Sequence, residues 1–238
     1  ALTLSGAGQG ASIITPAASN ITNDPITGSA IIRIQSSDVH VTGFTLDGDN
    51  TAITSGIVRG GADIDATSGI VTAYDVSENY DNLEIDHVTV ENIYLRGIEA
   101  RMTGTMNIHD NTVQNVQGDV NLSVAIFNRD GGGTISSNTV SGTPDAINAN
   151  HSRGTQFLNN TITDAQSGIH TDNSRDSGGT STDLIEGNTI SRGNEMGGPP
   201  SRGIWAFVPY QNGTCQDNTI SGFDIGIGAY SQGGAAGA

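Results

Sequence analysis

The sequence predicts an all-β solenoid, a stack of coils in which each coil contributes short parallel strands. Five copies of Asn-Thr-Val or Asn-Thr-Ile occur between residues 111 and 220, at intervals of 27, 22, 28 and 30 residues. Such intervals match one supersecondary unit with loops of variable length, which is typical of stacked repeats. The five copies begin at Asn111, Asn138, Asn160, Asn188 and Asn218.

An apolar residue five positions before the Val or Ile of each copy forms a second column. Its members alternate with polar neighbours, as in residues 83–86, which is the period of a strand with one buried face. Two earlier coils, ending at Leu46 and Val90, extend the alignment to seven copies. The column comprises Val41, Ile85, Ile108, Ile135, Phe157, Ile185 and Cys215.

A third column pairs Gly or Ala with Ile and predicts the remaining strand of each coil. Together the columns indicate three parallel sheets, and we expect each Ile of the third column to point inward. Its members are Gly56-Ile57, Gly97-Ile98, Ala125-Ile126, Ala146-Ile147, Gly168-Ile169, Gly203-Ile204 and Gly226-Ile227.

These columns and the Asn turns resemble the right-handed parallel β-helix of the pectate-lyase-like superfamily. The resemblance covers nearly the whole chain, because Leu2 to Gly8 also looks like an early coil. It implies about eight coils, an Asn ladder in the turn between the second and third sheets, and Gly-Ile strands in the first sheet. It also implies that the substrate groove of an enzyme would run along the first sheet. The chain contains no motif of a specific enzyme family of this fold.

Composition agrees with a thin solenoid rather than a thick globular core. The 238 residues include 33 Gly, and hydrophobic residues make up 34% of the chain. We expect a single β-helix domain over residues 1–232 and a Gly/Ala-rich tail or linker over 233–238. The linker-like C-terminal residues and the lack of a capping helix before Leu2 leave open that the chain is a fragment of a larger protein.

Charge narrows the choice of partners and compartment. The chain has 25 acidic residues, nine Arg and no Lys, and its net charge of −16 disfavours nucleic acid as a partner. An acidic surface favours an extracellular or cell-surface protein whose signal peptide is not part of this chain. No apolar run predicts membrane insertion.

The single Cys215 falls in the buried column, and we expect it to be a small core residue.

The predicted first sheet also locates a candidate site. If each Ile of the third column points inward, the residues one and three places later point outward, and we expect them to form an exposed stripe. This stripe holds the only Trp of the chain, two of its five Phe, two Arg and one His. It consists of Glu99, Arg101, Phe127, Arg129, Asn148, Asn150, His170, Asp172, Trp205, Phe207, Gly228 and Tyr230.

The stripe suggests chemistry on a sugar that carries a carboxylate. His170 is the candidate acid or base, because its ordinary pKa suits proton transfer near neutrality. Asp172 is expected to orient the His or bind a cation, while Arg129 and Arg101 neutralise the carboxylate. Substrate contacts are expected from Asn148, Asn150, Trp205, Phe207, Phe127, Tyr230 and Glu99.

Metal sites are predicted at two turn sequences rich in oxygen ligands. Asp47 with Asp49, and Asp172 with Asp176, are spaced as calcium ligands can be, although plain turns have the same composition. Three histidines lie elsewhere, in the second sheet and the turn after it. We expect these histidines to be spread over different register positions and to form no zinc site. They are His40, His87 and His109.

The sequence therefore predicts an exported β-helix that interacts with extracellular polysaccharide, as a lyase or C5-epimerase acting on uronates. Hydrolysis is disfavoured, because Glu99 and Asp172 are expected on the order of 14 Å apart, farther than a glycosidase pair. One alternative is a non-catalytic adhesin or structural module of a large cell-surface or fibre protein, with neighbouring domains as partners. A remote alternative is ice binding by Thr residues of the third sheet at positions 139, 161, 189 and 219.

Overall fold

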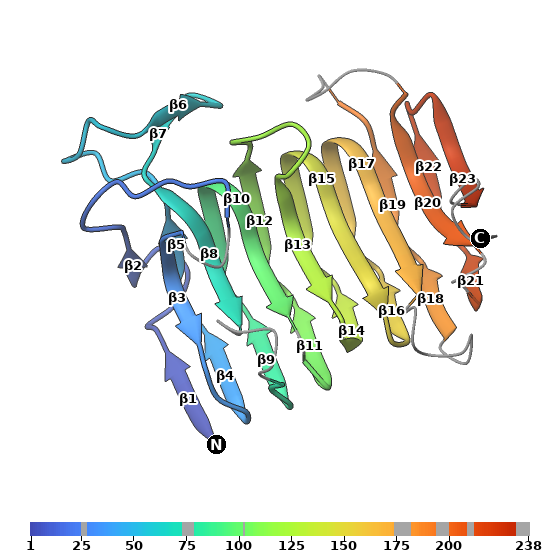
Figure 1. Ribbon diagram of the computed structural model, residues 1–238, viewed down its shortest axis with the longest axis horizontal. Coiled ribbons are helices and arrows are strands. Elements are labelled where there is room, and N and C mark those ends of the chain that lie inside the picture. The colour runs from blue at the N-terminus through green and yellow to red at the C-terminus, as the bar shows by residue number, and fades with distance from the viewer. Residues whose placement is uncertain are drawn as a thin grey trace, which may run out of the picture.

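The chain folds as a right-handed parallel β-helix (Figure 1). The computed structural model describes residues 1–24, 28–72, 79–101, 103–173, 182–193, 200–208 and 212–231. Within these ranges all regular elements are strands. A search of the same ranges for a helix long and apolar enough to cross a membrane finds none.

The second sheet contains eight parallel strands, one from each successive coil, which confirms the predicted number of coils. Its core positions include Val41, Ile85, Ile108 and Ile135, all fully buried, as the alternating pattern predicts. In sheet order, the strands are β1 (Leu2–Ser5), β4 (Val39–Thr42), β9 (Leu83–Asp86), β11 (Thr105–His109), β14 (Gly132–Ser136), β16 (Thr155–Leu158), β18 (Thr182–Glu186) and β21 (Asn212–Gln216).

The third sheet follows the Asn turns. It is built from β2 (Ile13–Ile14), β5 (Thr45–Asp47), β12 (Thr112–Val116), β19 (Thr189–Ser191), β22 (Thr219–Ser221) and the first parts of β10 (Thr89–Arg101), β15 (Thr139–Ser152) and β17 (Thr161–Asn173). The first sheet takes the last parts of β10, β15 and β17, together with β3 (Ala30–Ile34), β8 (Ala66–Thr72), β13 (Val124–Arg129), β20 (Arg202–Val208) and β23 (Ile225–Ser231). Three coils therefore carry one long strand through the corner between these sheets, where the sequence predicts two separate strands.

Side chains of the first sheet alternate about the predicted Ile column. Ile98, Ile126, Ile147 and Ile169 pair in register along the stack and are fully buried. The small residue before each Ile permits close packing between coils. At Gly97, for example, a Cβ atom would lie 2.5 Å from the carbonyl oxygen of Ala125 in the next coil.

One member of the predicted Ile column is wrong. Gly56-Ile57 lies outside the coil, where β6 (Ile57–Arg59) pairs antiparallel with β7 (Ala62–Ile64). The position in the first sheet belongs instead to Ile70, which pairs with Ile98. The hairpin is an insertion in this coil, and it projects beside the stack in Figure 1.

The Asn residues form the predicted ladder between the second and third sheets. Each side-chain Nδ2 donates to the Oδ1 of the Asn in the next coil, at 2.8–3.0 Å. Each Nδ2 also donates to a backbone carbonyl, as Asn138 does to Ile108 at 2.9 Å. At the start of the ladder, Oδ1 of Asn111 accepts the backbone N–H of Val88, at 3.0 Å. The ladder thus satisfies buried backbone groups at every turn that it crosses.

The prediction for Cys215 is wrong, because this residue is exposed. It lies on β21, the last strand of the second sheet in the described part of the chain. Its side chain occupies a core position, but no further described strand of that sheet stacks on it. The predicted tail at 233–238 lies outside the described residues.

Replacing a central ladder residue is expected to destabilise the stack. Asn138→Ala removes an acceptor from Asn111 and a donor from the Ile108 carbonyl, leaving buried polar groups unpaired. We expect a loss of roughly 2–4 kcal/mol in the free energy of unfolding, measured by urea denaturation followed by circular dichroism. Asn218→Ala, at the partly exposed end of the ladder, is the matched control and should cost less than half as much. Equal losses in the two variants would contradict a cooperative ladder.

Candidate active site on the first sheet

The predicted outward residues form two rows across the first sheet. One row follows the strand register from Glu99 through Phe127, Asn148 and His170 to Trp205. A second row pairs Arg101 with Arg129 and Asn150, and pairs Asp172 with Phe207 and Tyr230.

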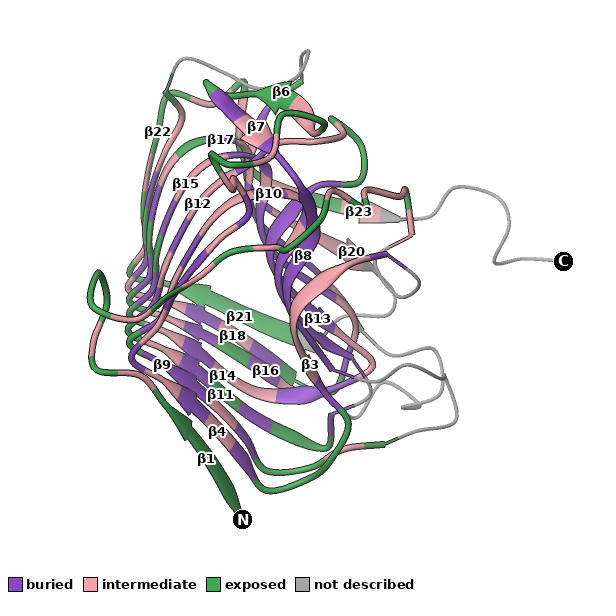
Figure 2. Cartoon of the chain, turned by 90° about the vertical axis from the view of Figure 1, so that its left-hand side faces the viewer, coloured by how far each residue is buried: buried purple, intermediate pink, exposed green. Residues whose placement is uncertain are grey.

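The predicted exposure of the stripe is wrong for five of its twelve members, which are buried. Glu99, Arg101, Phe127, Asn148 and His170 are only 2–8% exposed. In Figure 2 the buried colour runs along the whole of β8, where side chains that point in either direction are buried. Large side chains on neighbouring coils lie about 4.8 Å apart and cover one another. A residue can therefore point away from the core and still be buried.

His170 and three of the predicted substrate-contact residues form an aromatic cluster, defined as His170, Trp205, Phe207 and Tyr230. The His170 and Trp205 rings stack with centroids 3.9 Å apart, and the Phe207 ring lies 5.1 Å from each of them. Tyr230 meets Trp205 edge-on at 5.8 Å. Arg202 lies 4.7 Å above the Trp205 ring and donates from Nε to the Tyr230 hydroxyl, at 2.9 Å. These rings pack mainly on one another, which limits the faces they offer to a ligand.

The environment of His170 does not favour proton transfer to a substrate. Neither ring nitrogen makes a hydrogen bond to any described residue. The nearest carboxylate, Oδ2 of Asp145, lies 3.9 Å from Nδ1 and is engaged at 2.9 Å by Asn148. Stacking and burial thus hold His170 inside the cluster.

A separate cavity of about 530 Å³, here called the arginine pocket, lies beside the second row. It joins four of the predicted residues with four that the sequence did not suggest. Its lining consists of Asn23, Asp24, Arg96, Arg101, Phe127, Arg129, Asn150 and His151.

Glu99 organises the inner wall of the arginine pocket. Its carboxylate lies 3.2 Å from Nε of Arg101 and 3.6 Å from Nε of Arg96. The Arg96 guanidinium also lies 4.7 Å above the Phe127 ring. Burial lowers the pKa of Arg96, while the charge of Glu99 opposes that effect, and an Arg in this position stays protonated.

The outer wall contains Arg129 and His151. Arg129 is 41% exposed, and its Nε lies 3.6 Å from Asp130. The other oxygen of Asp130 contacts Nδ1 of His151 at 3.0 Å, which leaves Nε2 as the nitrogen available to a ligand. Asp172 accepts a hydrogen bond from the backbone N–H of His151 and so fixes its position. This contact is to the backbone of His151, and the predicted role of Asp172 beside His170 stays a prediction.

The sequence did not suggest His151 because strict alternation fails in β15. The strand register shifts between Ala149 and Ser152, and His151 has a positive φ of 55°. This irregularity turns the side chain toward the pocket. Asp130 and His151 directly follow the predicted outward residues Arg129 and Asn150 in adjacent coils. This placement was a possible signal, but alternation alone could not reveal it.

The calcium sites stay predictions. Oδ1 of Asp47 accepts hydrogen bonds from the Asp49 backbone and from Nδ2 of Asn92, and Asp49 accepts one from the Asp63 backbone. These contacts are those of a closed turn. The proposed partner of Asp172, Asp176, lies outside the described residues.

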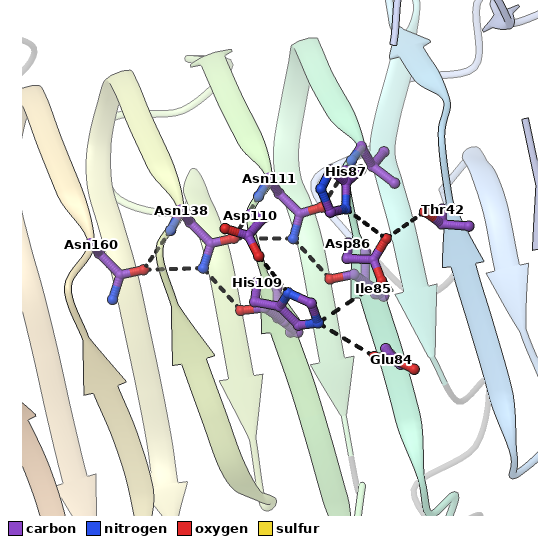
Figure 3. A network of polar contacts seen from close by, with 12 residues as sticks. Thr42, Glu84, Ile85, Asp86, His87, His109, Asp110, Asn111, Asn138 and Asn160 are labelled. Atoms are coloured by element: carbon purple, nitrogen blue, oxygen red, sulfur yellow. Dashed lines mark hydrogen bonds and ion pairs between the residues drawn. The ribbon is translucent and has the colours of Figure 1, made fainter. Parts of the chain in front are cut away.

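The three remaining histidines stand at different register positions, as expected, but all three approach one carboxylate. His40 contacts Asp86 at 2.7 Å. His87 contacts it at 3.0 Å, and His109 lies 3.9 Å from it (Figure 3). Burial alone would raise the pKa of Asp86, but hydrogen bonds from Thr42, His87 and His40 lower it below its usual value. The pKa of His109 is raised, because contacts with Asp110 and Glu84 outweigh the opposing effect of burial.

Comparisons with known proteins give two similarities. A profile of the NosD family, described as "Periplasmic copper-binding protein (NosD)", matches residues 123–235, slightly less than half of the chain. The A-module of the Azotobacter vinelandii mannuronan C-5 epimerase AlgE4 aligns with 97% of this chain and 82% of its own, at 20% identity and a TM-score of 0.35. No curated protein sequence matches significantly. Neither similarity assigns an activity to this chain, whose parallel β-helix fold follows from its own strand pairing.

The two candidate residues, His170 and Arg129, are expected to differ sharply in stability effects. His170→Ala should lower the free energy of unfolding by roughly 1–3 kcal/mol, because it removes a ring that stacks on Trp205. Arg129→Ala should change it by less than about 0.5 kcal/mol, because this guanidinium is largely solvated. Urea denaturation of the two purified variants tests this. A stable His170→Ala variant would show that the aromatic cluster is not packed as described.

Proposed function

We propose that the first sheet binds an acidic polysaccharide, with a sugar carboxylate in the arginine pocket. The single observation that carries this proposal is the gathering of Arg96, Arg101 and Arg129 around one cavity. The chain has only nine Arg and no Lys against 25 acidic residues, and three of the nine line this pocket. In a protein of this charge, a local group of guanidinium ions favours an anionic ligand.

The contacts indicate different roles for the three arginines. Glu99 pairs with Arg96 and Arg101, which fixes the inner guanidinium groups and balances much of their charge. Arg129 is the most available of the three, because its contact with Asp130 is longer than a hydrogen bond and the side chain is 41% exposed. A planar guanidinium can hold a carboxylate through two parallel hydrogen bonds. Arg129 is therefore the expected carboxylate ligand.

His151 supplies a group for proton transfer in the same pocket. With Nδ1 held by Asp130, neutral His151 can accept a proton at Nε2. Pairing of a uronate carboxylate with Arg129 would make the neighbouring C5 proton more acidic. Removal of this proton by His151, followed by cleavage of the C4–O bond with the leaving oxygen protonated by water, gives a lyase. Return of a proton from water to the opposite face of C5 gives an epimerase. Uronate elimination or epimerisation is the reaction that this pair supports best.

This function implies a compartment outside the cytoplasm, where acidic polysaccharides are found. The NosD family, whose profile matches residues 123–235, is described as periplasmic. The acidic composition is consistent with an exported protein. We therefore place the proposed activity in the periplasm or outside the cell.

A second candidate function is favoured by the third sheet. Seven Thr residues pair in register across successive coils, and the last four are exposed. A regular row of hydroxyl and methyl groups is the feature that suggests ice binding. Thermal hysteresis of the purified protein tests it directly. The row comprises Thr45, Thr89, Thr112, Thr139, Thr161, Thr189 and Thr219.

Replacing Arg129 is expected to weaken polysaccharide binding without affecting folding. We expect Arg129→Ala to bind pectate or alginate at least tenfold more weakly than wild type, because it loses a charge-assisted contact. Isothermal titration calorimetry measures this, with neutral dextran as the ligand control. Arg153→Ala is the matched variant, since Arg153 is exposed and does not line the pocket. Equal weakening in both variants, or no binding by wild type, would overturn the proposal.

Catalysis is tested separately through His151. Absorbance of unsaturated uronates reports elimination, and proton NMR reports epimerisation. We expect turnover by wild type, and loss of turnover with retained binding in His151→Ala, because the proton acceptor is removed. Binding without turnover by wild type would instead support a non-catalytic carbohydrate-binding module.

A further inference from the structure

We infer that the outer face of the second sheet binds one divalent transition-metal ion, held by His40, Glu84, Asp86 and His109. Among the described residues, a single group of three or more potential ligands lies this close together. It contains His40, Glu84 and Asp86, with one ligand atom of each within 4.8 Å of the others. His109 adds a fourth ligand, because its Nε2 lies 3.4 Å from Glu84 and 3.9 Å from Asp86.

The distances fit a small coordination shell. Metal–ligand bonds of about 2.0–2.1 Å in a tetrahedral site place ligand atoms about 3.3 Å apart. The contacts between His40 and Asp86, His109 and Glu84, and His109 and Asp86 measure 2.7, 3.4 and 3.9 Å, and so fall on both sides of that value. Of the four ligands, only His40, Glu84 and Asp86 have ligand atoms that all lie within 4.8 Å of one another, so the His109 side chain must move inward to complete the shell. The second sheet supplies the framework, because β4, β9 and β11 are adjacent and in register.

Neighbouring groups orient the ligands. Nδ1 of His109 contacts Asp110 at 2.8 Å, which favours a proton on Nδ1 and a lone pair on Nε2, directed at the site. Thr42 and His87 both contact Oδ1 of Asp86, and leave Oδ2 to face His40 and His109. In Figure 3, His87 and Thr42 meet the same oxygen of the Asp86 carboxylate, and His109 lies toward the other oxygen. Such supporting hydrogen bonds are typical of histidine–carboxylate metal sites.

Charge and access also favour a cation. In the part of the chain that the structure describes, the ion pairs of Glu84 and Asp86 are all with histidines. The carboxylate charge is therefore not balanced by an Arg. The four ligand side chains are 10–45% exposed, so an ion can reach them from solvent. Two imidazoles with two carboxylates suit Zn²⁺ or Cu²⁺ better than Ca²⁺, which prefers oxygen ligands alone.

This site is independent of the arginine pocket and of the family match. It lies on a different sheet from the pocket, and none of its four ligands falls within residues 123–235. Loss of metal binding and loss of polysaccharide binding would therefore be separate results.

Metal titration of the full chain tests the inference. The chain, stripped with a chelator, is titrated with Zn²⁺ and with Cu²⁺ at pH 7.5 by isothermal calorimetry. We expect one ion per chain at micromolar affinity or tighter, and at least tenfold weaker binding by His40→Ala and by His109→Ala. His151→Ala, which changes a histidine on the opposite side, is the matched control and should bind as wild type does. Failure of wild type to bind, or equal binding by the His40→Ala/His109→Ala double variant, would overturn the inference.

A measurement on the wild-type chain removes dependence on variant folding. The chain has five His, so their imidazole NMR signals can be assigned individually. Zn²⁺ should shift the signals of His40 and His109 and leave those of His151 and His170 in place. Shifts confined to His151 or His170 would place the metal elsewhere and refute the site.

Discussion

The structure depends on the exact superposition of equivalent residues in successive coils. Parallel strands about 4.8 Å apart repeat each sequence position as a row along the stack, and the Asn ladder holds the turn where two sheets meet. Each Asn satisfies both the next Asn and a backbone carbonyl, as Asn160 does with Asn188 and Ile135. Because the four ladder residues from Asn111 to Asn188 are buried and hydrogen-bonded, a coil cannot shift its register without leaving polar groups unpaired.

The same superposition determines what the surface can hold. On the first sheet it places Glu99 against Phe127, and His170 against Trp205, in directly adjacent coils. Side chains of this size cover one another, so charged groups in the row need partners. Glu99 meets this requirement by lying between Arg96 and Arg101. The row therefore becomes a packed layer, and the cavity forms beside it, where Arg129 and His151 are still partly exposed.

Much of the fold was predictable because equivalent residues recur at a fixed spacing within each coil. Asn111 and Ile108 recur with fixed spacing to their counterparts within each coil, and their positions are as predicted. Gly56-Ile57 misled because a second pair, Gly69-Ile70, occurs in the same coil, and only strand pairing distinguishes them. Exposure was not predictable, because alternation gives the direction of a side chain and not the size of its neighbours. His151 was missed because a register shift in β15 breaks the alternation.

The histidine site shows a further consequence of stacking. His40 pairs in register with Glu84, and Asp86 pairs with His109, so the sequence columns alone assign the two histidines to different rows. Long side chains on diagonal positions of adjacent strands can still meet, as His40 and Asp86 do at 2.7 Å. An ion held there would link three coils. The middle one, which carries Glu84 and Asp86 on β9, continues into β10 with Arg96 and Arg101, the two inner arginines of the pocket. Because each coil of a solenoid is stabilised by its immediate neighbours, the proposed metal site would also stabilise the coil that shapes the proposed carboxylate site.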